Sequence, residues 1–210
     1  MTEVEVWWGR IEQVRAEFAD DLDPVEQQRL KAYVRAEDKA RFLLGCTIVR
    51  RLLAHRLSLP PAKISLDRTC PECGKPHGKV RAEGAELSVT HSGDLVGVAI
   101  SDRPVGLDVE KVDPGLDVAG VASISLSDAE LAALPRNDER VHAFTTYWTR
   151  KEAIVKATGD GLRTDLRTIT GAPNGFQVIQ LTVDPGYVAA LAVVSAEPPV
   201  VRTLSAQVLI

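Results

Sequence analysis

The sequence predicts an α+β fold built from two similar lobes, at about residues 1–103 and 104–210. The order of the expected elements is the first indication: helices, a strand hairpin, a long helix, then a second hairpin. The second is that apolar runs at 95–101 and 187–195 occupy matching places in the two halves. The third is size, because 210 residues suffice for two small lobes with a substantial core. A ligand site between the lobes is the expected arrangement, since clefts of this kind are common ligand sites.

The first half is predicted to begin with a strand at about 7–13, followed by two helices. Asp23 as N-cap and Pro24 at the first helical position start a helix that reaches about residue 34. A second helix spans about 37–57 and ends before two prolines; its expected buried stripe is Phe42, Leu43, Val49, Leu52 and Leu53. A strand at 64–66, a Gly- and Pro-containing loop and a hairpin over 87–101 complete this half.

The second half is predicted to contain a strand at 105–110, an irregular stretch to about 125 and then helices. Ser127 and Glu130 form a capping box for a short helix that stops at Pro135. The next helix runs from about 139 to Gly159, which supplies left-handed backbone at its end. Strands at 176–183 and 187–195 form the second hairpin, and 200–209 is an expected edge strand.

The long helix carries the first candidate site. Phe144, Trp148, Lys151 and Val155 recur at helical spacing, and Glu152 and Lys156 lie one turn apart on the flank of that stripe. An ordinary surface pair of this kind contributes about 0.3–0.5 kcal/mol. Beside an apolar face, however, the two charges are partly desolvated, which is where carboxylate and ammonium groups become chemically useful.

The strand at 105–110 carries the second candidate site. Its period-2 pattern places Asp108 and Glu110 on one face, about 6–7 Å apart. Two such carboxylates indicate either a solvated face or a site for a hard cation, Mg²⁺ or Mn²⁺, whose remaining ligands are phosphate oxygens and water.

Together these two segments resemble the signatures of 4′-phosphopantetheinyl transferases. Gly-Leu-Asp-Val-Glu at 106–110 is similar to G-[IV]-D-[IV]-E, with Leu107 as the departure. Trp-Thr-Arg-Lys-Glu-Ala-Ile-Val-Lys-Ala-Thr-Gly at 148–159 is similar to W-x-x-K-E-A-x-x-K-x-x-G. Other segments also fit, so the resemblance covers most of the chain, and it is to the long single-chain class (surfactin-synthetase-activating) that serves polyketide and nonribosomal peptide synthases. It implies the same pseudo-twofold arrangement of two α+β lobes.

The resemblance also implies contacts to coenzyme A from the first half. The segment 37–43 is similar to the family's arginine-bearing helix, which favours Arg29 and Arg41 as contacts. In the loop, Lys75 has the Gly-Lys-Pro letters and Lys79 has the better spacing, so both stay candidates for the phosphate-binding lysine. Leu-Ser-Val-Thr-His-Ser at 87–92 is similar to F-N-[LIV]-S-H-S, which implies that Thr90 and His91 hold the 3′-phosphate side of coenzyme A.

The implied reaction is Mg²⁺-dependent transfer of the phosphopantetheine arm of coenzyme A to a serine hydroxyl of an acyl or peptidyl carrier protein, with release of 3′,5′-ADP. Attack falls on the β-phosphorus of the pyrophosphate. Asp108, Glu110 and Glu152 are the expected metal ligands; Asp108 and Lys156 also belong to the coenzyme A site. Glu152 is the expected general base, Lys156 is expected to stabilise or protonate the leaving phosphate, and Lys151 is the alternative for that role.

Two other interpretations are weighed against the transferase. A different nucleotide phosphotransferase is disfavoured because the chain has no G-x-x-x-x-G-K-[ST] loop. A non-catalytic binding module that kept the fold would be expected to lack an acid or a lysine of the motifs, and all are present.

Cysteine content and charge complete the expectations. Three cysteines argue against a disulfide framework, and Cys70, Cys73 and His77 resemble part of a zinc knuckle that lacks a second Cys-x-x-Cys, so a reduced loop is expected. A net charge of −4 gives no footprint for nucleic acid. With no signal segment and no apolar run of membrane length, a cytoplasmic protein without a membrane partner is expected. A monomer is expected because a two-lobed chain has less need to dimerise.

Overall fold

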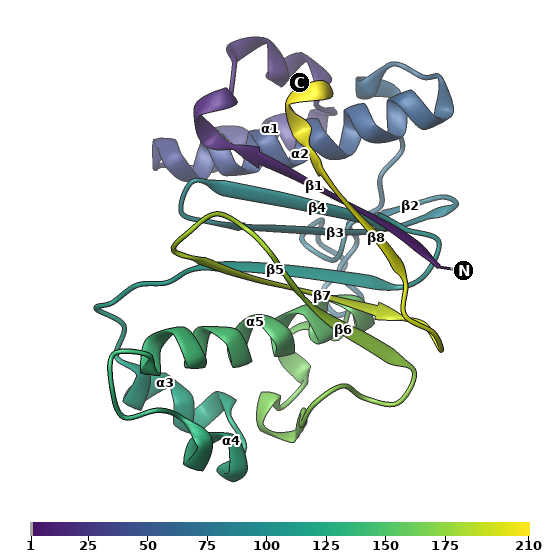
Figure 1. The fold of residues 1–210 in the computed structure, drawn as a ribbon. Helices are drawn as coiled ribbons and strands as arrows, with labels where there is room; N and C mark the ends of the chain where they lie inside the picture. The colour runs from purple at the N-terminus through teal and green to yellow at the C-terminus, as the bar shows by residue number, and fades with distance from the viewer. Residues whose placement is uncertain (1) are drawn as a thin grey trace. The chain divides into compact units, whose positions relative to one another are not determined.

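The computed structural model describes residues 2–210, with Leu162 described by its backbone alone. The chain forms two compact units: a first unit of Glu3–Asp102 with Val201–Ile210, and a second unit of Arg103–Val200 with Thr2. Each unit has its own β-sheet and its own helices (Figure 1). The predicted α+β class is therefore confirmed, whereas the pseudo-twofold relation of the lobes stays a prediction.

The first unit is a five-stranded sheet with one long helix packed on it. The strand order is β2-β3-β4-β1-β8, and β3 pairs antiparallel with β4, as β4 does with β1. The elements are β1 (Glu3–Arg10), α1 (Pro24–Ala32), α2 (Ala36–Leu57), β2 (Arg81–Ala82), β3 (Ala85–Ser92), β4 (Leu95–Ser101) and β8 (Val200–Ser205). The apolar face of α2 packs on this sheet and forms the core of the unit with it; Leu44, Ile48, Leu87, Val96 and Val98 are members.

The second unit is a three-stranded antiparallel sheet covered by α5. The strand order is β5-β7-β6. The elements are β5 (Val105–Lys111), α3 (Val118–Ser125), α4 (Asp128–Ala133), α5 (Arg140–Thr158), β6 (Phe176–Leu181) and β7 (Tyr187–Val194). Ala153 and Ala157 of α5 pack with Ala190 and Ala192 of β7, and small side chains at both positions let the helix approach the sheet closely. The amino-terminal half of α5 packs against α3 and α4 through Phe144 and Trp148.

Most elements lie where the sequence predicts them. Asp23 caps α1 with a full capping box, and Ser127 does the same for α4. Gly159 ends α5 with φ of 79°. The first strand begins and ends earlier than predicted, because a short 3₁₀ turn follows Arg10.

Two expectations for secondary structure were wrong. The strand predicted at 64–66 does not form; the carbonyl oxygens of Pro61 and Ile64 instead accept hydrogen bonds from the buried guanidinium of Arg50. The stretch before Ser125, predicted to be irregular, contains α3. Its glycine and serines lower helix propensity, but Asp117 caps its first turn and Val118, Ala122 and Leu126 are buried. In residues 2–210 we find no helix with the length and apolar character needed to cross a bilayer.

Candidate active site

A glycine brings α5 directly against β5. An added Cβ on Gly106 would lie 1.9 Å from the carbonyl oxygen of Ala153 and 2.4 Å from the backbone nitrogen of Ala157. The face of β5 that contains Gly106 therefore faces the helix. Because alternate residues of a strand share a face, Asp108 and Glu110 lie on this side as well.

The acidic residues of β5 meet the charged pair of α5 on this face. Lys156 Nζ donates a hydrogen bond of 2.6 Å to Asp108 Oδ1. Asp108 is 3% exposed, and Glu152 and Glu110 are half-buried. Burial raises the pKa of Glu152, the negative charges of Asp108 and Glu110 raise it further, and the ammonium of Lys156 opposes them. Four predicted site residues are therefore close enough for their charges to interact, and we name Asp108, Glu110, Glu152 and Lys156 the acid–lysine cluster.

The donor set of the acid–lysine cluster suits a hard divalent cation. Three carboxylates face one lysine, so the cluster has excess negative charge and offers oxygen ligands. Within residues 2–210, however, these three carboxylates do not form a group whose ligand atoms all lie within 4.8 Å of one another. Mg²⁺ usually takes one or two carboxylates and completes its shell with phosphate and water. The residues therefore fit a magnesium ion, to which they would supply part of the ligand shell.

Lys151 lies on a different side of α5 from the acid–lysine cluster. Its ammonium donates to the carbonyl oxygens of Ser125 and Leu166, at 3.0 and 2.9 Å, and to Glu130 Oε2 at 2.6 Å. The side chain is 3% exposed. Lys151 thus joins α5 to α4 and to the chain beyond the helix, so the structure does not bring this predicted catalytic alternative to Asp108.

In the first unit, Arg41 and His91, two of the residues predicted to contact coenzyme A, lie near each other. Arg41 donates to the carbonyl oxygen of Gly93, in the β3–β4 turn, and to Asp38 Oδ1, both at 2.6 Å. The hydrogen bond from Arg41 is the main cause that lowers the pKa of Asp38, and the charges of Arg35 and His91 add to it. The exposed His91 and the start of α2 are therefore adjacent.

Thr90 lies on the opposite face of the same sheet. Leu87 and Val89 pack in the core beneath α2, so strand alternation puts His91 on the α2 side and Thr90 on the other side. Thr90 is 3% exposed. The two residues predicted to hold the 3′-phosphate side of coenzyme A thus point to different faces of β3.

The other predicted cations lie around the loop that precedes β2. Arg29 donates to the carbonyl oxygen of Pro76 at 3.0 Å, and its guanidinium lies 5.0 Å from the ring centre of Phe42. Lys75 is exposed. Lys79 lies 3.5 Å from Glu86, and burial lowers its pKa. The structure therefore places Arg29 and Lys75 at this loop and Lys79 beside β3.

Sequence reasoning missed Asp38 as the partner that positions Arg41. Its spacing of three residues before Arg41 on one helix was the available signal. Arg50, on the same helix as Arg41, is fully buried and paired with Asp23 and Glu26. That side chain serves the core of the first unit and is unavailable to a ligand.

Comparison with known proteins identifies the family of the chain. A model of the 4′-phosphopantetheinyl transferase superfamily matches residues 104–198, and a model of the amino-terminal part of 4′-phosphopantetheinyl transferases matches residues 7–103. The chain is 28% identical to the 4′-phosphopantetheinyl transferase HetI of Nostoc sp., over 91% of this chain and 87% of that protein. It is also 28% identical to the 4′-phosphopantetheinyl transferase Sfp of Bacillus subtilis, over 86% of this chain and 85% of that protein. With the two models adjoining at residues 103 and 104, the chain belongs to the 4′-phosphopantetheinyl transferase superfamily, in its long single-chain class, and is a transferase enzyme.

Proposed function

We propose that this enzyme transfers the phosphopantetheine arm of coenzyme A to a serine hydroxyl of an acyl or peptidyl carrier protein, with Mg²⁺ as cofactor. The observation that carries the proposal is the convergence of Asp108, Glu110, Glu152 and Lys156 on facing surfaces of β5 and α5. Three acids and a lysine at this place suit a diphosphate that is bound with a divalent ion.

The reaction exchanges a phosphoanhydride bond of coenzyme A for a phosphoester bond to the carrier serine. The serine oxygen forms a bond to the phosphorus that carries the pantetheine arm, and the bond from that phosphorus to the bridging oxygen breaks. The serine proton is taken up by a base, and the bridging oxygen leaves as part of 3′,5′-ADP. Mg²⁺, held by Asp108, Glu110 and Glu152, would neutralise charge on the pyrophosphate and fix its position.

Glu152 is the proposed general base. A base works best when its pKa lies near the working pH. Burial and the neighbouring acids raise the pKa of Glu152 toward that range. Its position on α5, close to Asp108, Glu110 and Lys156, suits both metal binding and uptake of the serine proton.

Lys156 is proposed to stabilise the leaving phosphate. Its side chain is 30% exposed, so the ammonium is accessible to a ligand while it remains bonded to Asp108. This bond orients the ammonium before coenzyme A arrives, and a preorganised donor does not have to reorganise as charge develops in the transition state.

The first unit is proposed to bind the nucleotide part of coenzyme A. Arg41 and His91 supply a guanidinium and an imidazole on the α2 side of the sheet, and Arg29, Lys75 and Lys79 supply further cations around the loop. Thr90 offers a hydroxyl from the opposite face, so we propose that Thr90 and His91 contact different groups of the ligand. Substitution of each residue by alanine, with KM for coenzyme A as the readout, ranks these contacts.

We further propose that the carriers served are those of polyketide and nonribosomal peptide synthases, that Mn²⁺ can replace Mg²⁺, and that the enzyme acts as a cytoplasmic monomer. Resemblance to the long single-chain class supports the choice of carrier. Sedimentation of the purified protein tests the monomer.

Intact-mass measurement of the carrier tests the central proposal. The enzyme is incubated with coenzyme A, Mg²⁺ and an apo carrier protein, with a peptidyl, a polyketide acyl and a fatty-acid acyl carrier compared in parallel. A mass gain of one phosphopantetheine on the carrier, with release of 3′,5′-ADP, is expected. The gain should be absent when the acceptor serine is replaced by alanine or when metal is chelated. No mass gain on any carrier contradicts the proposal, and a gain that survives chelation contradicts the metal requirement.

A further inference from the structure

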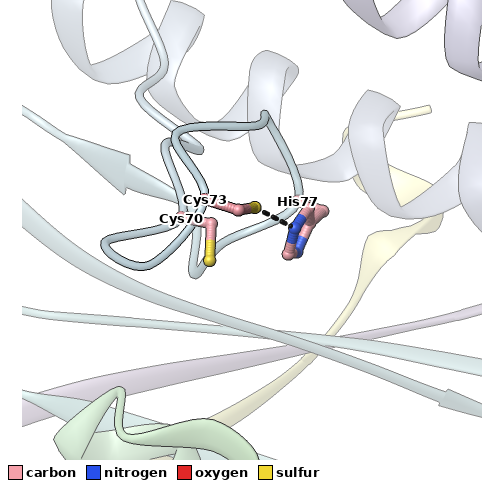
Figure 2. Close-up of side chains that lie close together, drawn as sticks. All are labelled: Cys70, Cys73 and His77. Carbon is pink, nitrogen blue, oxygen red and sulfur yellow. Dashed lines mark hydrogen bonds between the residues drawn. The ribbon is translucent and has the colours of Figure 1, made fainter.

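A tight loop of the first unit brings three metal-ligating side chains together. Cys70, Cys73 and His77 lie between the 3₁₀ turn Pro61–Lys63 and β2 (Figure 2). Their ligand atoms all lie within 4.8 Å of one another, and within residues 2–210 they are the group of three or more such side chains that meets this condition. None of them belongs to the acid–lysine cluster.

The backbone of the loop has the form of a metal knuckle. Gly74 N donates to the carbonyl oxygen of Cys70, and Cys70 N donates to that of Lys75, both at 2.9 Å. Gly74 has φ of 69°, a left-handed conformation that a residue with a side chain rarely adopts. This turn directs the sulfur atoms of Cys70 and Cys73 to one side of the loop, where His77 lies (Figure 2).

The donor atoms lie close to the spacing that a metal ion requires, since all three are within 4.8 Å of one another. Cys73 Sγ and His77 Nε2 are 2.9 Å apart. With Zn–S of about 2.3 Å and Zn–N of about 2.0–2.1 Å, ligand atoms around a tetrahedral ion are roughly 3.5–3.8 Å apart. Small side-chain rotations would therefore seat an ion.

We propose that Cys70, Cys73 and His77 bind one Zn²⁺, with the fourth position taken by water. Two thiolates and an imidazole select a soft or borderline ion over Mg²⁺. Cys70 is buried and Cys73 and His77 are exposed, so the loop would hold the ion from one side and leave the other open to solvent. The sequence favours a reduced loop because a second Cys-x-x-Cys is missing. In the structure, His77 lies close to both sulfur atoms and can act as the third ligand.

The ion would fix the loop that carries Lys75. Arg29 holds this loop at Pro76, and Gly78 N donates to the carbonyl oxygen of Arg68 at 2.7 Å. These bonds anchor the part of the loop around and after His77, and a bound ion would anchor the part from Cys70 to His77. The proposed role is structural: the ion would hold this loop, and none of its three ligands belongs to the acid–lysine cluster.

Cobalt titration of the whole chain tests the site. Reduced protein is stripped with a chelator, returned to buffer with excess Mg²⁺ to fill oxygen-ligated sites, and titrated with Co²⁺ and then Zn²⁺. One equivalent of Co²⁺ should give a thiolate-to-metal absorption band and the strong visible bands of a tetrahedral site, and one equivalent of Zn²⁺ should remove both. Octahedral, oxygen-ligated Co²⁺ gives neither signal.

Matched variants locate the bound ion. Cys73→Ser and His77→Ala should weaken Co²⁺ binding by more than the roughly 10–100-fold loss that follows removal of an outer-shell partner. Cys46→Ala and His55→Ala are the controls, because each removes a thiol or an imidazole elsewhere in the first unit, and both should keep full binding. Protease cleavage between residues 70 and 78 should be slower with Zn²⁺ in the unaltered protein and unaffected by Zn²⁺ in Cys73→Ser.

Three results would overturn the proposal. They are absence of a sulfur-to-cobalt band in the reduced, unaltered protein, equal bands in Cys73→Ser and in the Cys46→Ala control, and a Cys70–Cys73 disulfide that persists in reductant. None of them bears on the transfer reaction, so failure of this site and failure of the proposed function are separate outcomes.

Discussion

Lys156 Nζ lies 2.6 Å from Asp108 Oδ1, and this hydrogen bond joins the last turns of α5 to the middle of β5. Asp108 is 3% exposed, so its charge would be costly without a partner. The same bond presents a partly exposed ammonium at the place where the carboxylates gather. One contact thus stabilises the second unit and prepares its proposed catalytic face.

Lys156→Met should abolish most transfer while the enzyme still folds. The substitution removes a donor from the leaving phosphate, and loss of one such preorganised donor lowers kcat by about 10²–10³-fold. It also leaves Asp108 without its ammonium, so the free energy of unfolding should fall by about 1.5–3 kcal/mol. Arg150→Met is the matched control, because Arg150 is an exposed cation on the same helix. Steady-state kinetics and thermal unfolding check both effects; equal activity in the two variants would refute the role of Lys156.

Glu152→Gln should lower the rate of transfer but stabilise the metal-free enzyme, whereas Lys156→Met should lower both. Loss of a general base lowers kcat by about 10²–10⁴-fold. Yet burial, together with Asp108 and Glu110, raises the pKa of Glu152, so ionised Glu152 destabilises the metal-free fold. The stability contributed by the neutral form is present below the ordinary glutamate pKa of about 4.3 and is lost as the pH rises through the raised value.

In chelator at neutral pH, Glu152→Gln should therefore unfold at a higher temperature than the unaltered enzyme, and the difference should vanish below about pH 4. Glu139→Gln is the control, since Glu139 is exposed directly before the same helix and its side chain makes no capping hydrogen bond. A lower unfolding temperature for Glu152→Gln at neutral pH would mean that its carboxylate makes a stabilising contact instead.

The acid–lysine cluster could be predicted from the sequence because two simple periodicities define it. Strand alternation puts Asp108 and Glu110 on one face, and helical spacing puts Glu152 and Lys156 on one flank. Neither pattern states which side of the strand meets the helix. That follows from Gly106, whose missing side chain admits the backbone of α5.

Whether an individual cation is buried in an ion pair or available to a ligand could not be predicted in this way. Helical periodicity places Lys151 in a buried stripe, but its partners are Glu130 and the carbonyl oxygens of Ser125 and Leu166, which tertiary packing brings together. Arg50 belongs to a locally basic stretch, yet it is buried against acids of the chain around α1. Charge counting along a segment cannot distinguish a core ion pair from a ligand contact.

Gly106→Ala should destabilise the second unit and reduce transfer together. The new methyl would lie 1.9 Å from a backbone oxygen of α5, so the helix itself must move. Overpacking costs about 1–3 kcal/mol and occasionally more, and backbone clashes belong at the upper end. Gly115→Ala is the control, because its nearest neighbour is a side-chain oxygen of Asp113 at 3.3 Å. Chemical denaturation should show the loss for Gly106→Ala alone; an unchanged midpoint would disprove this close approach.

Glu110→Gln should raise the Mg²⁺ concentration needed for half-maximal transfer more than it lowers the rate at saturating metal. Glu110 is half-buried near the end of β5, so its loss removes an oxygen ligand without exposing the core. A neutral amide is a weaker ligand for a hard cation than a carboxylate. Glu197→Gln, an exposed glutamate of the same unit, is the control. An unchanged Mg²⁺ titration in Glu110→Gln would remove this residue from the metal site.

The ion pair of Glu130 with Lys151 should make the second unit sensitive to acid. Partial burial by itself would raise the pKa of Glu130, but hydrogen bonds from Lys151 and Ser127 outweigh it and lower that pKa. A lowered pKa in the folded state gives stability that is fully present above the ordinary glutamate value of about 4.3 and is lost as the pH falls through the lowered value. Glu130→Gln should thus cost about 1.5–3 kcal/mol at pH 7, and progressively less below about pH 4.

Asp128→Asn is the matched control for this ion pair, because its carboxylate lies on the same short helix and is 93% exposed. Urea unfolding at several pH values measures both variants. Transfer per folded molecule should stay near that of the unaltered enzyme in Glu130→Gln, since neither Glu130 nor Lys151 contacts the acid–lysine cluster through the bonds described above. If Glu130→Gln lost transfer without losing stability, Lys151 would instead have the catalytic role for which it is the alternative to Lys156.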